Sequence, residues 1–417
     1  NQMSISDNVG ALNRHLGEIR TGVKYLEAKD DVKKFLNRLP AGAPMVDTIK
    51  RTKKRIKYMF VQGVIFEELG FKYVGPVDGH NIQELIATLD RIKKIEGPVL
   101  VHVKTVKGKG YKYAENNPAE YHGVSPFDLK TGKPLKKSDI PSYSSVFGKT
   151  LEKLAEKDRK ILAVSAAMRS GTGLAGFARK YPDRFFDVGI AEQHAVSFSA
   201  ALAKGGFKPV FAVYSTFLQR GYDEIMQDVC LQGLHVVFGV DRAGIVGSDG
   251  ETHQGIYDIS YFRHMPNMTV MMPKNGVELE KMLDFALNRM DSPVAIRYPR
   301  GEVSLRYSDN CNDIEYGKGE ILKDGEKIAV LSAGSMLDEA DDVCTLLEKD
   351  GYRPVLLNLR FAKPVDKELI KNVCEKCEYV FTIEDNVFEG GAGCAVLETI
   401  SEEENIKNVV FHAFAFP

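Results

Sequence analysis

Apolar residues along this chain fall into short runs that alternate with segments of helical periodicity. After Gly63, VIFEELG predicts a helix, FKYVGPV a strand, NIQELIATLDRIKKI an amphipathic helix and PVLVHVKTV a buried strand. This β-α-β order predicts a parallel sheet. Residues 1 to about 60 predict polar helices and loops.

Two further alternating series follow the polar stretch Lys130 to Ser142, which we interpret as a linker. The first begins at Ser144, and its expected strands are KILAVSA, FFDVGI, PVFAVYS, HVVFGVD, TVMMP and PVAIRYP. The second begins near Lys318, after a polar segment around Asp309, with KIAVLSAG, PVLLNLR and YVFTIED. We therefore expect an α/β protein with three successive open α/β domains and mostly parallel sheets, bounded at 1–138, 139–308 and 309–417.

Composition narrows the classes of partner. The formal net charge of 417 residues is −1, so neither nucleic acid nor an anionic membrane surface is an expected partner. The basic run KRTKKRIK, Lys50 to Lys57, is interpreted as a solvated helix face. No apolar run reaches membrane-spanning length, and the amino terminus has no signal-peptide pattern. Six scattered cysteines favour a reducing compartment.

Cys374 and Cys377 form a C-x-x-C spacing, which is typical of redox or zinc sites. No second pair and no nearby histidine completes a zinc site, and both cysteines are predicted on one helix, KELIKNVCEKC. We therefore interpret the C-x-x-C spacing as a coincidence rather than as a redox or zinc site.

Polar clusters follow several of the predicted strands, where open parallel sheets bind ligands. Each cluster also has an ordinary explanation, because Gly, Pro and Asp make turns. The clusters are GPVDGH (Gly75 to His80), YSTF (Tyr214 to Phe217), DRAG (Asp241 to Gly244) and YPRG (Tyr298 to Gly301).

The loop DRAGIVGSDGETHQG, Asp241 to Gly255, is the most informative of these segments. Its glycines allow close backbone approach to a ligand, and Arg242 is suited to binding phosphate through a bidentate fork. The alternative is a surface Ω-loop without a ligand.

Glu192 stands in DVGIAEQHAV, at the expected start of a helix. An acid there is favoured by the helix dipole by about 0.3 to 1 kcal/mol, so a purely structural role is possible. His194 is two residues further on and faces another side of the helix, so it is not the acid–base partner of Glu192.

Together these segments resemble the 1-deoxy-D-xylulose-5-phosphate synthase family of transketolase-like enzymes. The match spans nearly the whole chain in the family's order. It rests on NQMSISDNVGAL, YVGPVDGHN, KTVKGKGY, DVGIAEQHAV, YSTFLQRGYD, DRAGIVGSDGETHQG and YPRG. The resemblance implies the transketolase type of fold, with a diphosphate-binding, a pyrimidine-binding and a carboxyl-terminal domain.

The resemblance also implies a reaction and its partners. Pyruvate loses carbon dioxide and its two-carbon remainder joins D-glyceraldehyde 3-phosphate, which gives 1-deoxy-D-xylulose 5-phosphate for isoprenoid, thiamine and pyridoxal synthesis. The implied cofactors are thiamine diphosphate and Mg²⁺, and the implied assembly is a homodimer. A bacterial cytoplasm is the expected location, with a plastid-type organelle for a eukaryotic source.

Residue roles carried over from the family concern the cofactor first. Glu192 would hydrogen-bond the aminopyrimidine ring, Phe217 would pack against that ring, and Ile190 would contact the cofactor beside Glu192. His80 and His253 match family histidines at the reacting carbon, where a histidine can move protons near neutral pH.

A second set of carried-over residues concerns the acceptor substrate. Arg242 and Arg300 match the pair that holds its phosphate, with Tyr214, Arg220 and Asp249 in the surrounding pocket.

The amino terminus departs from the family pattern. Asn1 and Met3 match the end of the magnesium motif, but the family's GDG segment does not occur in this sequence. We therefore expect a truncated chain that binds the cofactor poorly and turns over slowly or not at all. Two alternatives stay open: another transketolase-like enzyme with a different donor and acceptor, and a catalytically silent scaffold or partner subunit.

Overall fold

The computed structural model describes residues 64–124, 126–135, 138–309, 311–402, 406 and 409–417. The chain divides into two units between Lys137 and Ser138, within the polar stretch predicted as a linker, and each unit is described by itself. The predicted domain boundaries at 138/139 and 308/309 stay predictions.

The described part of the first unit is built around a β-α-β motif. Strands β1 (Lys72–Asp78) and β2 (Val99–Lys104) pair in parallel, as predicted, on either side of helix α5 (Ile82–Ile92). Asn81 caps α5 by accepting a hydrogen bond from the Glu84 amide. The shorter helical segments are α4 (Val64–Glu68), α6 (Lys112–Asn116) and η2 (Glu120–His122).

A seven-stranded sheet forms the first half of the second unit, in the order β12-β7-β8-β6-β5-β3-β4. Every pairing is parallel except that of β12 with β7, so the prediction of a mostly parallel sheet is confirmed. The strands are β3 (Ile161–Ser165), β4 (Phe185–Asp187), β5 (Lys208–Tyr214), β6 (Val237–Asp241), β7 (Thr269–Met271), β8 (Val294–Arg297) and β12 (Phe361–Lys363).

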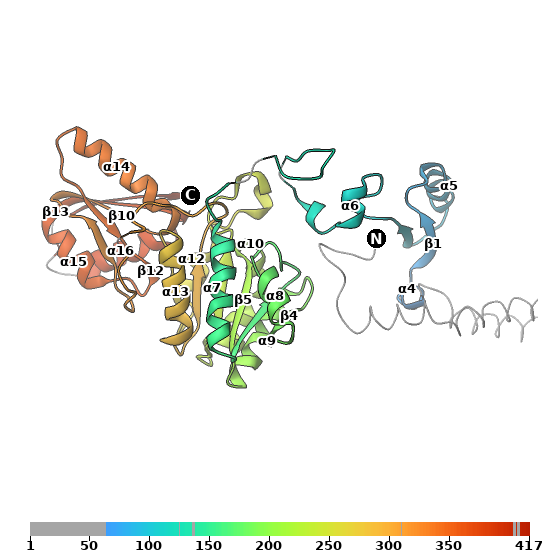
Figure 1. Ribbon diagram of the computed structural model, residues 1–417, viewed down its shortest axis with the longest axis horizontal. Coiled ribbons are helices and arrows are strands. Elements are labelled where there is room, and N and C mark those ends of the chain that lie inside the picture. The colour runs from blue at the N-terminus through green and yellow to red at the C-terminus, as the bar shows by residue number, and fades with distance from the viewer. Residues whose placement is uncertain (1–63, 125, 136–137, 310, 403–405, 407–408) are drawn as a thin grey trace, which may run out of the picture. The chain divides into compact units, whose positions relative to one another are not determined.

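Helices cover both faces of this sheet, as its continuous apolar strands require. Helices α7 (Tyr143–Lys157) and α13 (Gly276–Asn288) lie side by side on one face (Figure 1), and α9 (Glu192–Lys204) packs on the other with the π-helix η5 (Ile225–Cys230) and α12 (Asp258–Arg263). The remaining helical segments here are α8 (Ala175–Lys180), η3 (Pro182–Arg184), α10 (Ser215–Leu218), η4 (Gln219–Gly221), α11 (Tyr222–Glu224), η6 (Gly247–Asp249) and η7 (Glu251–His253).

A five-stranded sheet forms the second half, in the order β14-β13-β10-β11-β9, parallel except where β9 meets β11. Its strands are β9 (Glu320–Lys323), β10 (Lys327–Ser332), β11 (Val355–Asn358), β13 (Cys377–Val387) and β14 (Val410–Phe416). Its helical segments are η8 (Gly334–Met336), α14 (Leu337–Lys349), α15 (Lys367–Lys376) and α16 (Ala392–Glu402).

One apolar core is continuous between the two sheets. It joins side chains of β5, β6 and α12 to side chains of β10, β11, α15 and α16. The chain also returns from the second sheet to the first, because β12 follows β11 in sequence but pairs with β7. The two sheets of this unit are therefore joined by a shared apolar core and by the chain segment that leads from β11 in one sheet to β12 in the other.

The Cys374–Cys377 pair lies across the end of a helix and the start of a strand. The placement of Cys374 and Cys377 on one helix was wrong, because α15 ends at Lys376 and Cys377 begins β13. All six cysteines are free, and burial raises the pKa of both thiols of this pair to about 11, so they stay protonated near neutral pH.

None of the helices among the described residues has the length and apolar character needed to cross a bilayer.

Candidate active site

Most of the predicted site residues lie just beyond the carboxyl ends of strands in the seven-stranded sheet. Glu192 follows β4, Tyr214 ends β5, Arg242 follows β6 and Arg300 follows β8. Parallel strands end at one edge of a sheet, where ligands of open α/β proteins bind. The topology therefore brings residues more than a hundred positions apart to the same edge.

Glu192 is the first residue of α9 and is 3% exposed. Its Oε1 lies 3.4 Å from Nη1 of Arg220, whose side chain is 56% exposed. Gly221 permits this close packing, because a Cβ there would lie 2.9 Å from the Val196 side chain. A carboxylate that only matches the helix dipole has no need of burial, so the burial of Glu192 favours a binding role over the structural one.

A pair of aromatic rings lies between Arg220, which contacts Glu192, and Arg242. The rings of Tyr214 and Phe217 are stacked with centroids 5.6 Å apart, and the Arg220 guanidinium lies 5.9 Å from the Phe217 centroid. His253 meets Phe217 edge-on at 5.3 Å, and its Nδ1 lies 2.9 Å from the Thr252 hydroxyl. Burial raises the pKa of Tyr214 to about 12, so its hydroxyl stays protonated. These contacts unite four of the predicted residues with Glu192.

Arg242 is fixed by several contacts at the end of β6. Its Nη1 donates to the Ser144 Oγ (2.9 Å), the Gly171 carbonyl (2.7 Å) and the Asp241 carboxylate (2.8 Å). The guanidinium carbon lies 4.2 Å from the centroid of the Tyr214 ring. The backbone of Arg242 has φ of 58°, which is costly for a residue with a side chain and persists where surrounding contacts enforce it.

Arg242 and Arg300 line the same pocket, whose volume is about 370 Å³. The Arg300 Nη1 donates to the Val246 carbonyl at 3.3 Å, and its Nε lies 3.4 Å from the Asp249 carboxylate. The backbone of Gly244 pairs with that of Gly255, which closes the loop around this pocket. The complete lining is Ser142, Ser144, Arg242, Ile245, Val246, Arg300 and Gly301.

His80 lies in the first unit, and its ring is held by its own neighbourhood. The Val106 amide donates to its Nε2 (2.7 Å), and its backbone amide donates to the Asp78 carboxylate (2.9 Å). Ile190 is 58% exposed and forms an apolar surface before α9.

The predicted metal ligands Asn1 and Met3 lie outside the described residues. Within the described ranges, no group of three or more His, Cys, Asp or Glu side chains has the arrangement of a metal site.

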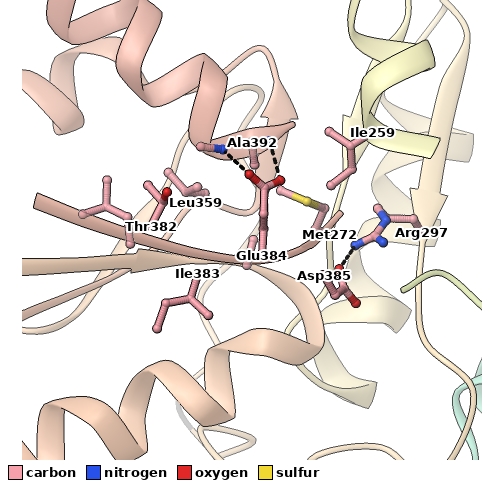
Figure 2. A pocket seen from close by; sticks show the side chains of 12 residues that line it. Ile259, Met272, Arg297, Leu359, Thr382, Ile383, Glu384, Asp385 and Ala392 are labelled. Carbon is pink, nitrogen blue, oxygen red and sulfur yellow. Dashed lines mark hydrogen bonds and ion pairs between the residues drawn. The ribbon is translucent and has the colours of Figure 1, made fainter. Parts of the chain in front are cut away.

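Sequence reasoning did not single out Ser144, and it did not predict the buried ion pairs of this unit. Arg297 at the end of β8 lies between the carboxylates of Asp258 (2.9 Å) and Asp385 (2.7 Å), which joins the two sheets. Figure 2 shows Arg297 directed at Asp385, next to Glu384, around a small cavity of about 10 Å³. The sequence signal that could have indicated such buried charges is an acidic or basic residue at the end of an apolar strand, as in VFGVD.

Three family models match the sequence. They are described as 1-deoxy-D-xylulose-5-phosphate synthase (residues 1–105), transketolase pyrimidine binding domain (140–305) and transketolase C-terminal domain (317–413).

Two solved structures are similar to this chain. A split-gene transketolase, titled an inactive β4 tetramer, matches with a TM-score of 0.59 and 28% identity over 66% of this chain and 88% of that one. The transketolase of Campylobacter jejuni matches with a TM-score of 0.54 and 21% identity over 79% of this chain and 61% of that one, which supports the fold alone.

Curated relatives named 1-deoxy-D-xylulose-5-phosphate synthase cover almost all of this chain. The protein of Natranaerobius thermophilus is 50% identical over 405 residues, which are 96% of this chain and 64% of the relative. The protein of Caldanaerobacter subterraneus subsp. tengcongensis is 51% identical over 411 residues, 98% of this chain and 66% of the relative. The chain thus spans slightly less than two thirds of the length of these relatives. Taken with the three family models, these matches show that the chain belongs to the 1-deoxy-D-xylulose-5-phosphate synthase family of transketolase-like proteins.

Proposed function

We propose that this protein joins pyruvate to D-glyceraldehyde 3-phosphate, with loss of carbon dioxide, to give 1-deoxy-D-xylulose 5-phosphate. The observation that carries the proposal is the convergence of Arg242 and Arg300 on one pocket. Two guanidinium groups suit a phosphate dianion, and a phosphorylated aldehyde supplies one. The pocket adjoins the Tyr214–Phe217 stack that leads to Glu192.

The residues around Glu192 fit the pyrimidine half of thiamine diphosphate. A carboxylate held in a largely dry setting forms a strong hydrogen bond with a ring nitrogen, and the half-buried Phe217 offers an aromatic face for a planar ring. When bound, thiamine diphosphate supplies the carbanion that attacks the carbonyl carbon of pyruvate. Glu192 would hold a proton shared with the ring, and Phe217 and Ile190 would orient the ring.

His253 and His80 are proposed to move protons at the reacting carbon. His253 is only partly buried, and its contact with Phe217 keeps it beside the proposed cofactor position. Since the Nε2 of His80 accepts the Val106 amide, that nitrogen is the basic one in the ring's neutral form.

Three further parts of the proposal rest on the family resemblance. Asn1 and Met3 would supply oxygen ligands to Mg²⁺, which prefers such ligands and would bridge to the diphosphate. Assembly with a second copy is proposed because exposed apolar residues such as Ile190 and Tyr222 lie close to the site residues in sequence. A cytoplasmic location is proposed, with six free cysteines in its support.

Release of carbon dioxide from pyruvate tests the proposed function. For a protein that also carries the family's diphosphate-binding segment, with thiamine diphosphate and Mg²⁺ present, we expect release to accelerate when D-glyceraldehyde 3-phosphate is added. Turnover of a ketose phosphate donor, with none of pyruvate, would instead assign the protein to another transketolase-like reaction.

A second candidate is a chain that contributes the pyrimidine and acceptor sites but requires a separate chain for turnover. It is favoured by the 28% identical transketolase chain from a split gene, whose title describes an inactive tetramer. Pyruvate turnover by this chain alone would exclude the candidate. Turnover that appears only after addition of a chain with the diphosphate-binding segment would support it.

A further inference from the structure

The acceptor pocket contains a hydroxyl group to which the family resemblance gives no role. Ser144 lies in the first turn of α7 and lines the pocket together with Arg242 and Arg300. Its Oγ accepts a hydrogen bond from Arg242 Nη1 at 2.9 Å, and the same nitrogen donates to the Asp241 carboxylate at 2.8 Å. A serine hydroxyl can accept this bond, because its oxygen has two lone pairs.

The start of α7 fixes the position of this serine. Ser142 caps the helix by accepting a hydrogen bond from the Ser145 amide, and the Tyr143 amide donates to the Gly301 carbonyl. The fully buried ring of Tyr143 stacks on that of Tyr298. Ser144 therefore directly follows a buried and well-anchored residue at the capped start of the helix.

Arg242 uses one terminal nitrogen of its guanidinium group for its hydrogen bonds to the described residues. Among the described residues, the hydrogen bonds of its guanidinium all start from Nη1, whose two hydrogens are shared by Ser144, Gly171 and Asp241. Nε is buried and has no partner among them. The Tyr214 ring supports one face of the guanidinium. With one terminal nitrogen occupied, Nη2 is the group left to bond a ligand in the pocket.

We propose that Ser144 is a positioning residue for acceptor selection: it holds the Arg242 guanidinium so that Nη2 faces the phosphate of a phosphorylated aldehyde. This inference rests on the proposed function. A neutral hydroxyl orients the guanidinium without cancelling its charge, whereas another carboxylate there would compete with the phosphate. The hydroxyl therefore contributes to discrimination between phosphorylated and unphosphorylated acceptors.

Binding of two ligands to three proteins tests this inference without requiring turnover. D-glyceraldehyde 3-phosphate and D-glyceraldehyde are titrated by NMR into the wild-type protein, Ser144→Ala and Ser145→Ala. Ser145 is the matched control, because it is the next residue of α7 and does not line the pocket.

We expect Ser144→Ala to weaken binding of the phosphorylated aldehyde by about 5- to 10-fold, the scale of one ordinary hydrogen bond, because the lost bond acts on the ligand only through the orientation of Arg242. Binding of D-glyceraldehyde should change by less than about twofold, and Ser145→Ala should change neither. The ratio of the two affinities is independent of any misfolded fraction, because both ligands are measured on the same preparation.

Equal weakening of both ligands, or no selective change in Ser144→Ala, would overturn the inference. So would failure of the wild-type protein to bind the phosphorylated aldehyde. If the selective loss appears but pyruvate is not decarboxylated, the inference stands and the proposed function fails. If pyruvate is decarboxylated and Ser144→Ala binds like Ser145→Ala, the proposed function stands and the inference fails.

Discussion

At the scale of single residues, the environment of Glu192 bears on whether this carboxylate binds a ligand or only matches the helix dipole. An acid at a helix start is ordinary, but this one is buried against an arginine that is more than half exposed. The sequence identified Glu192, Phe217, Arg242 and Arg300 because their motifs are specific and follow strands. It did not identify Ser144, because a serine near a helix start has an ordinary capping explanation.

Glu192→Gln should lower pyruvate turnover by at least about 100-fold, the lower range for loss of a positioned proton-transfer group. The amide keeps the size of the side chain but cannot share a proton in the same way. Turnover and the thermal unfolding midpoint should be measured together, and the midpoint should change little.

Glu156→Gln is the matched control, because that carboxylate is 66% exposed near the end of α7. Turnover of Glu192→Gln within a few-fold of this control would restore the helix-dipole interpretation.

Arg300→Ala should raise the KM for D-glyceraldehyde 3-phosphate by about tenfold or more and leave the KM for pyruvate within about twofold, because it removes a charge-assisted contact to one substrate. The side chain is 37% exposed, so stability should change little. Steady-state kinetics with each substrate varied in turn gives both constants.

Arg289→Ala, at the exposed end of α13, controls for the general loss of positive charge. A rise of the two KM values in parallel would show that Arg300 does not act on the acceptor.

At the scale of elements, the junction of the two sheets in the second unit is held by buried charge. Arg297 of β8 bonds Asp258 of α12 and Asp385 of β13, and the neighbouring Glu384 accepts hydrogen bonds from the Ala392 and Gly393 amides at the start of α16. The carboxylate of Glu384 thus caps this helix from inside the protein (Figure 2). Hydropathy patterns predicted the strands that meet here but not these pairs, because burial of a charge depends on a partner distant in sequence.

Glu384 makes stability depend on pH. Burial raises its pKa from 4.5 to about 7, against the opposing effects of the two amides and Arg297. Between these values the folded protein keeps the proton and the unfolded chain releases it, so unfolding releases a proton and is favoured as pH rises. The contribution of Glu384 is therefore fully present below about pH 4.5 and is lost as pH rises through about 7.

Glu384→Gln should flatten this pH dependence, by up to about 3 kcal/mol over the interval. Urea unfolding at several pH values measures it, and Glu402→Gln at the exposed end of α16 is the control. Because burial also raises the pKa of Asp241 and Asp258, some slope should remain. Identical slopes in wild type and Glu384→Gln would contradict the prediction.

At the scale of the whole molecule, alternating apolar runs were enough to predict successive α/β layers. The strands missed were β9, β12 and β14, and each has a reason. Both β9 and β14 are edge strands, none of the side chains of β14 is fully buried, and β12 is short. The return of β12 to the first sheet of its unit is a tertiary pairing, which local patterns do not encode.

The central claim is that pyruvate is the donor and a phosphorylated aldehyde the acceptor. NMR of a reaction with pyruvate labelled with ¹³C at the carbonyl carbon tests it most directly, with D-glyceraldehyde 3-phosphate, thiamine diphosphate and Mg²⁺ present. If this chain requires a separate chain for turnover, as in the second candidate function, the chain with the diphosphate-binding segment is added to the reaction. The account predicts that the label appears as the ketone carbon of 1-deoxy-D-xylulose 5-phosphate and that carbon dioxide carries none. Label that stays in pyruvate while a ketose phosphate donor is consumed would contradict it.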